Sequence, residues 1–259
     1  MLIAGRPDRI VNSASHRAPA NRSEQGRQVT WKTDYISFYY EDAPEPDEIA
    51  IDPASTALLM VDLQNTYMTS ARQHPRWADF GTRMDEIVIP NASRIIDACR
   101  RGAIEVLHAR IACRTDDGRD RSLSQKRPGF NNLLLPMHDG PSQLIDAVAP
   151  VGDEICVIKT TDSALTGTNL RLILHNLGIR TVIVAGIFTD QCISSTVRSL
   201  ADESFDVFLV HDACAAGTME LHNHELAVLN RIYCQVLGTG ELLDFIACAG
   251  ATKTSLTPT

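Results

Sequence analysis

The feature of this 259-residue sequence that most constrains its fold is an alternation of short apolar runs with amphipathic segments. Runs that contain no polar alternation are typical of strands buried on both faces of a parallel sheet. Apolar residues three and four apart predict helices between them. The predicted strands are 57–61, 105–108, 155–158, 182–185, 207–210 and 235–237, and the predicted helices are 87–99, 170–177, 193–201 and 224–232.

This order predicts an α/β protein with a three-layer α/β/α, Rossmann-like fold around a six-stranded parallel sheet. We expect the domain to span 50–248 and a long loop to connect the second and third strands over 110–150. Residues 1–49 are expected to form an N-terminal extension that is partly disordered and includes an aromatic strap at 31–40. Residues 249–259 are expected to be a flexible tail.

Charge and cysteine content narrow the class of ligand. With 24 Lys and Arg against 32 Asp and Glu, the formal net charge is −8, which argues against nucleic-acid or anionic-membrane partners. No apolar run reaches the roughly 18 residues of a membrane span, and the first 30 residues lack a secretory apolar region, so we expect a cytoplasmic protein. The seven cysteines are scattered and contain no CxxC pair, which predicts reduced thiols. A small-molecule ligand fits best.

Three residues follow predicted strands at positions suited to chemistry: Asp62, Lys159 and Cys192. Ligands of open parallel sheets bind beyond the carboxyl ends of the strands, so these side chains are expected to meet. Cys192 precedes a predicted helix, whose free N–H groups, with the ammonium of Lys159, would favour a thiolate. Together they provide a nucleophile, a base and an electrostatic partner. Without further information, the alternatives are a helix-capping Asp, a solvated Lys and a small core Cys.

Three segments together carry a resemblance to a known family. They are ALLMVDLQN at 57–65, Ile-Lys at 158–159 with the residues that follow to 170, and VAGIFTDQCISSTVR at 184–198. In this order and spacing they resemble the isochorismatase-like cysteine hydrolases, over about residues 50–246. Residues 51–53 and 62–67 look most like the ureidoacrylate amidohydrolases, with biuret- and triuret-type hydrolases and N-carbamoylsarcosine amidase nearby.

The resemblance implies a hydrolase that acts on carbon–nitrogen bonds other than peptide bonds, here a small linear amide or ureide. Asp62, Lys159 and Cys192 would be the catalytic triad, with a covalent thioester-like intermediate and release of ammonia or an amine. The Ile187–Phe188 peptide bond would be cis, and the N–H groups of Phe188 and Cys192 would form an oxyanion hole. No cofactor is implied, and relatives of this kind form homodimers or homotetramers.

Several departures leave the substrate open. Nicotinamidases of the family hold a metal with an Asp and two His, but His74 is the sole histidine between 64 and 98, so no metal is predicted. Isochorismatases proper lack the cysteine nucleophile, so Cys192 argues against their chemistry. Leu165 stands where ureidoacrylate enzymes tend to have an aromatic residue, and Phe188 where a small residue is common.

Substrate contacts are predicted from position alone. Amide side chains would hydrogen-bond the substrate, aromatic ones would form the pocket wall, and an arginine at the end of the second strand would meet a carboxylate. Each has an ordinary alternative, such as capping a turn, facing solvent or pairing with Asp116 or Asp117. The predicted contacts are Asn65, Tyr67, Arg110, Phe188 and Gln191.

Other functions remain as alternatives to a ureide hydrolase. A dinucleotide-dependent oxidoreductase is disfavoured because no GxGxxG follows the first strand. A catalytically silent small-molecule-binding or scaffold protein on the same fold, or an amidase for a non-ureide amide, stays open.

Overall fold

The computed structural model describes residues 34–44, 51–128 and 133–254 and contains a six-stranded sheet in the order β3-β2-β1-β4-β5-β6. All neighbouring strands are parallel. The apolar runs therefore predicted the six strands of this sheet correctly, and the fold class is confirmed. The strands are β1 (Thr56–Val61), β2 (Glu105–Ile111), β3 (Cys156–Lys159), β4 (Thr181–Ile187), β5 (Asp206–Ala215) and β6 (Gln235–Leu237).

The predicted helices correspond to α3, α5, α6 and α7, while α1, α2, α4 and α8 were not predicted. Helix α7 begins at Met219 rather than 224, because the Thr218 hydroxyl accepts a hydrogen bond from Leu221 N–H and caps the helix. The helices are α1 (Asn65–Gln73), α2 (Ala78–Arg83), α3 (Ile89–Arg101), α4 (Leu123–Lys126), α5 (Leu170–Asn176), α6 (Ser194–Asp202), α7 (Met219–Leu229) and α8 (Thr239–Thr254), with π-helical turns at Met84–Val88 and Thr189–Ile193 and 3-10 turns at Phe38–Tyr40, Pro75–Trp77, Gly140–Ser142 and Asp146–Val148.

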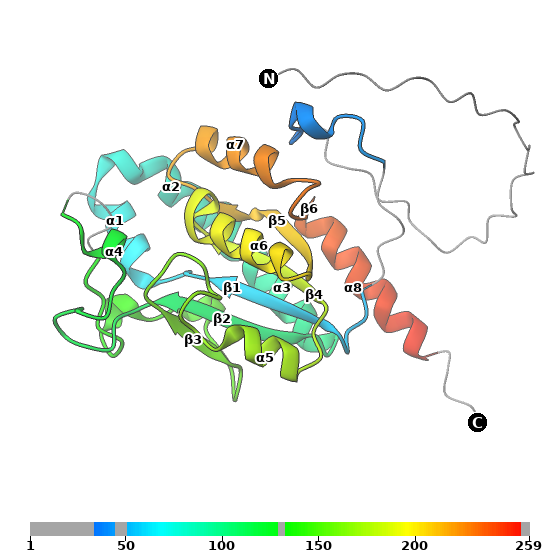
Figure 1. Ribbon diagram of the computed structural model, residues 1–259, viewed down its shortest axis with the longest axis horizontal. Coiled ribbons are helices and arrows are strands. Elements are labelled where there is room, and N and C mark those ends of the chain that lie inside the picture. The colour runs from blue at the N-terminus through cyan, green and yellow to red at the C-terminus, as the bar shows by residue number, and fades with distance from the viewer. Residues whose placement is uncertain (1–33, 45–50, 129–132, 255–259) are drawn as a thin grey trace, which may run out of the picture.

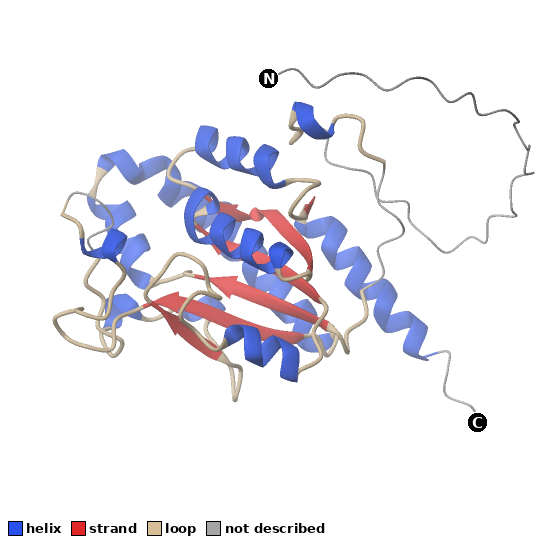
Figure 2. Cartoon of the chain, viewed as in Figure 1, coloured by secondary structure: helices blue, strands red, loops and turns tan. Residues whose placement is uncertain are grey.

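The helices form layers on the two faces of the sheet. Helices α5 and α6 cover the face nearer the viewer in Figure 1, and α3 and α8 pack together behind it. The direction of the strand order reverses between β1 and β4, since β2 and β3 extend to one side of them and β5 and β6 to the other. Figure 2 shows the arrowheads of the central strands pointing toward the side where α1 and α4 lie. In a sheet of this kind the reversal opens a crevice at the carboxyl ends.

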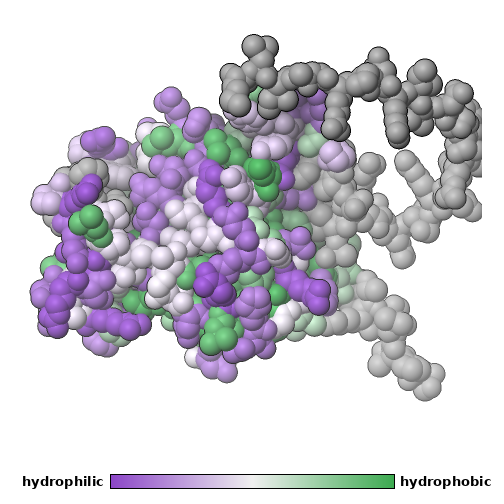
Figure 3. All heavy atoms as spheres, in the orientation of Figure 1, coloured by the Kyte–Doolittle hydropathy of each residue, from purple (hydrophilic) through white to green (hydrophobic). Residues whose placement is uncertain are grey.

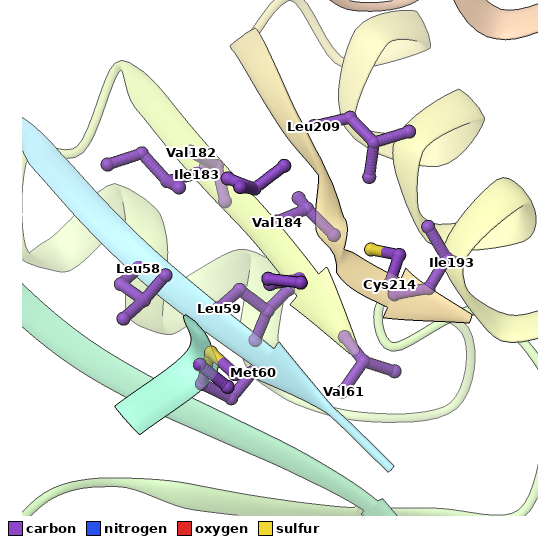
Figure 4. Packing of buried hydrophobic residues seen from close by; sticks show 14 of the residues in the cluster. Leu58, Leu59, Met60, Val61, Val182, Ile183, Val184, Ile193, Leu209 and Cys214 are labelled. Atoms are coloured by element: carbon purple, nitrogen blue, oxygen red, sulfur yellow. The ribbon is translucent and has the colours of Figure 1, made fainter. Parts of the chain in front are cut away.

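The two central strands approach each other closely where they end. Strand β1 is buried along its whole length, and Figure 4 shows its side chains packed beside those of β4. Gly186 of β4 has a φ of 130°, and a Cβ there would lie 2.0 Å from the carbonyl oxygen of Val61. Glycine is therefore required at the point that brings the end of β1 against the end of β4.

Part of the aromatic strap packs on the domain. Asn230 Nδ2 donates to the Tyr35 carbonyl at 2.8 Å, and the ring of Tyr35 lies 5.5 Å from that of His211, whereas Phe38 and Tyr39 are exposed. The predicted disordered arm over 1–30 and the start of the strap lie outside the described residues. Helix α8 continues to Thr254, past the expected domain end at 248, and residues 255–259 of the expected tail are also outside the described part.

One face of the molecule is mostly polar. The face in Figure 3 carries mainly hydrophilic residues with scattered apolar ones between them. Among the described residues, no helix combines the length and apolar character needed to cross a bilayer.

Candidate active site

The structure brings the three strand-end residues together in a buried cluster. Asp62 follows β1, Lys159 ends β3, and Cys192 lies in the π-helical turn after β4. Lys159 Nζ is 2.7 Å from Asp62 Oδ2 and 3.3 Å from Cys192 Sγ. The side chains of Lys159 and Asp62 are 0% and 1% exposed, so the ion pair is shielded from water.

The backbone turn at Asp62 aims its carboxylate across the sheet. Its φ of 56° lies in the left-handed region, which Asp tolerates better than most residues. Asp62 N–H donates to Ala109 O at 2.9 Å, and Ile111 N–H donates to Asp62 Oδ1 at 2.9 Å. The end of β2 thereby holds Oδ1 of the carboxylate, and Oδ2 contacts the ammonium of Lys159.

Burial and mutual attraction act against each other in the pKa values of the pair. Burial raises the pKa of Asp62 above its ordinary value, although the neighbouring Lys159 lowers it in part. For Lys159, burial lowers the pKa, but the neighbouring Asp62 and Cys192 outweigh burial and leave the pKa raised. The ammonium of Lys159 therefore keeps its proton in this site.

The thiol of Cys192 differs from the sequence-based expectation. Burial raises its pKa well above the ordinary value, and Asp62 raises it further; Lys159 lowers it without reversing the shift. The expected lowering of its pKa by helix N–H groups and Lys159 is therefore outweighed by the desolvation of a 4% exposed residue. Asp162, which the sequence did not single out, places Oδ1 3.9 Å from Sγ.

The turn before Cys192 is shaped by Phe188. The Ile187–Phe188 peptide bond is cis, which confirms that prediction. The ring of Phe188 lies 5.1 Å from Tyr67, edge to face, and 5.2 Å from Phe80. These ring contacts hold Phe188 in place at the start of the turn that contains Cys192. The oxyanion role of the Phe188 and Cys192 N–H groups stays a prediction.

A narrow pocket opens beside the thiol. The free space in it is about 20 Å³, room for roughly one water molecule. Of the predicted substrate contacts, Tyr67, Phe188 and Gln191 line this pocket. The lining residues are Tyr67, Ile111, Gln125, Leu133, Phe188, Gln191 and Cys192.

The structure places Asn65 and Arg110 outside that lining. Arg110 donates to Ser142 O at 2.8 Å and Met137 O at 2.9 Å, and Asn65 Nδ2 donates to Gly140 O at 3.2 Å. Both side chains stabilise the loop around 137–142. The guanidinium of Arg110 thus donates to backbone carbonyls of this loop, and its contact with a substrate carboxylate stays a prediction.

The pocket also contains residues that sequence reasoning missed. Gln125 in α4 and Leu133 after it belong to the long loop between β2 and β3, far in sequence from every strand end. Their only signal was the length of that loop. Within the described ranges, no group of three or more His, Cys, Asp and Glu side chains is arranged to hold a metal ion.

Comparisons with known proteins agree with the geometry. A model of the isochorismatase domain matches residues 56–241. The chain is 31% identical over 215 residues to the ureidoacrylate amidohydrolase RutB of Acinetobacter baylyi, covering 77% of this chain and 87% of that protein. It is 29% identical over 202 residues to YrdC, an uncharacterized isochorismatase family protein of Bacillus subtilis, covering 73% and 96%.

A solved structure shows the same fold. The cysteine hydrolase from Pseudomonas syringae superposes with a TM-score of 0.70 at 24% identity, over 80% of this chain and 99% of that one.

Proposed function

The chain belongs to the isochorismatase family, and we propose that it is a cysteine-dependent amidohydrolase that cleaves the C–N bond of a small linear amide or ureide. The observation that carries the proposal is the contact of Lys159 Nζ with both the carboxylate of Asp62 and the sulfur of Cys192 in a buried site. A base and a cation then lie behind a nucleophile that lines a pocket. The similarity to a ureidoacrylate amidohydrolase supports this class of substrate.

The first step forms the bond between sulfur and carbon. Burial raises the pKa of the thiol, so the attack needs a base, and the carboxylate of Asp62, which contacts the same Lys159 ammonium as Sγ, takes that role. As Asp62 accepts the proton, Sγ attacks the substrate carbonyl carbon and the C=O electron pair moves to oxygen. Backbone N–H groups of Phe188 and Cys192 stabilise that oxygen. Lys159 stays beside the sulfur and the carboxyl group.

The second step breaks the C–N bond. The oxygen's electron pair re-forms the carbonyl, the nitrogen leaves with the proton held by Asp62, and ammonia or an amine departs. Cys192 is left as a thioester, or as a thiocarbamate when the substrate is a ureide. Asp62 then removes a proton from water, the hydroxyl attacks the acyl carbon, and the thiol regains its proton as the acid product leaves.

The test is ammonia release from a panel of amides. The panel contains ureidoacrylate, biuret, triuret, N-carbamoylsarcosine, maleamate and nicotinamide. We expect release from at least one compound and a loss of about 10³-fold or more in Cys192→Ala. Cys248→Ala is the control, because this thiol is exposed on α8 and leaves the pocket unchanged. No hydrolysis of any compound, with saturable binding of one, would instead favour the catalytically silent binding protein.

A further inference from the structure

Gln125 is a buried amide without a hydrogen-bond partner at the wall of the pocket. The residue is 2% exposed and lines the same cavity as Cys192. Neither Oε1 nor Nε2 has a partner within the part of the chain that the structure describes. A buried amide with no partner is unfavourable, and folded proteins contain few of them. At a ligand pocket, the substrate can supply both partners.

Hydrogen bonds hold the backbone around Gln125, although the side-chain amide of Gln125 has no hydrogen bond within the described residues. Arg121 donates from one guanidinium nitrogen to Leu133 O at 2.7 Å and to Gln125 O at 3.2 Å. Its Nε donates to Gly118 O at 3.1 Å. Arg121 therefore joins the two pocket residues of the β2–β3 loop, so the position of the unbonded amide is set by the fold.

The charges around the pocket indicate an uncharged substrate. No described lining residue carries a positive charge. The nearby cation is Lys159, which is already paired with Asp62, while the Asp162 carboxylate lies 3.9 Å from Sγ. Arg110 and Arg121 point their donors at backbone carbonyls. Among the described lining residues a substrate carboxylate would find no cation, and the Asp162 carboxylate near Sγ would repel it.

We propose that Gln125 is a specificity-determining residue that binds an amide or ureide group of an uncharged substrate through a paired contact. This inference rests on the proposed function. Nε2 donates to a substrate carbonyl and Oε1 accepts from a substrate N–H, a pattern that an amide group complements. The N–H groups of the oxyanion hole bind the oxygen of the carbonyl under attack. Gln125 therefore binds a second amide group of the substrate, next to the one that is cleaved.

A pair of substrates tests the charge requirement. N-carbamoylsarcosine carries a carboxylate, and its primary amide replaces that carboxylate with a neutral second amide whose C=O and one N–H lie on the same edge, without altering the ureide. We expect kcat/KM at least about 10-fold higher for the primary amide. Equal or higher activity toward the carboxylate would overturn the assignment of an uncharged substrate.

A pair of variants tests the residue. We expect Gln125→Leu to lower kcat/KM for the primary amide by about 10- to 100-fold, mainly through KM, as two hydrogen bonds are lost. Its Tm should stay equal or rise, because an unpartnered amide is replaced by an apolar side chain of similar size. Gln235→Leu is the matched control, since Gln235 is also buried with an unpartnered Nε2 but lies on β6, at the far edge of the sheet from β3.

Binding separates failure of this inference from failure of the proposed function. The Kd of the primary amide is measured with Cys192→Ala, alone and combined with Gln125→Leu, so no turnover is needed. A Kd about 10-fold weaker or more in the double variant supports the contact, even if no hydrolysis is found. An unchanged Kd, or a fall in Tm that parallels the loss of kcat/KM, would show that Gln125 has no role in substrate binding.

Discussion

The buried pair of Asp62 and Lys159 predicts that replacing one partner costs far more stability than replacing both. At 2.7 Å and an effective dielectric constant of about 20, their attraction is about 6 kcal/mol. Burying each charge costs several kcal/mol, so the pair as a unit contributes little net stability. Lys159→Met leaves the carboxylate buried and alone, and we expect it to lower the free energy of unfolding by about 3–5 kcal/mol at pH 7. Asp62→Asn with Lys159→Met should stay within about 1 kcal/mol of the unsubstituted protein.

The loss in Lys159→Met should depend on pH with a definite sign. Burial already raises the pKa of Asp62, and removing Lys159 removes a cause that lowers it. The folded-state pKa then lies further above that of the unfolded chain, so the folded protein binds a proton more readily. As pH falls from 7 through that folded-state pKa, Asp62 becomes neutral and the loss shrinks. The double variant lacks the carboxylate and should show no such recovery.

Urea unfolding at pH 7 and pH 5 measures both effects. Lys126→Met serves as the control for a Lys-to-Met change, because Lys126 Nζ donates to Arg119 O at an exposed position. The reasoning is refuted if Lys159→Met costs less than about 1 kcal/mol. It is equally refuted if the loss is the same at both pH values, or if the double variant is as unstable as the single one.

Other contacts give sharp expectations. Gly186→Ala should lower stability by more than about 4 kcal/mol, because a Cβ would lie 2.0 Å from a β1 carbonyl; an unchanged Tm would contradict this. Burial is the main cause that raises the pKa of Cys192, and Asp162 raises it further. Asp162→Asn should therefore lower the pH midpoint of thiol alkylation by iodoacetamide. An unchanged midpoint would argue against the contact. Thr189→Val removes the hydroxyl 2.7 Å from Nδ1 of the buried His222 and should cost about 1–3 kcal/mol in urea unfolding, whereas a variant of full stability would mean that the hydrogen bond contributes nothing.

The strand-end residues were predictable because two short-range signals coincide at them. An uninterrupted apolar run marks a strand buried on both faces, and a polar residue directly after it marks the carboxyl end. Asp62 satisfies both conditions. Arg110 does not satisfy the second condition, because β2 continues to Ile111; Arg110 lies inside the strand and donates to a carbonyl of the following loop. A polar residue within a buried strand is indistinguishable in sequence from the residue that ends it.

The missed features depend on contacts between distant segments. Gln125 reaches the pocket because the β2–β3 loop folds back over the end of β2, with Arg121 bonded to Leu133. No periodicity in the loop encodes that contact. The pKa of Cys192 was misjudged for the same reason: its local position after a strand suggests a thiolate, but burial by the surrounding chain dominates.

The two parts of the site rest on different parts of the fold, and this division has a consequence for specificity. The groups proposed for chemistry are fixed by strand ends, with the Asp62 carboxylate bonded to a backbone N–H of β2 and to Lys159 of β3. The pocket wall that holds Gln125 comes from the β2–β3 loop, in which Arg121 joins Gln125 to Leu133. Changes in that loop can therefore alter which amide is bound while the attacking thiol and its base keep their positions. Relatives that share the strand ends but differ over 112–150 are expected to differ in substrate before they differ in mechanism.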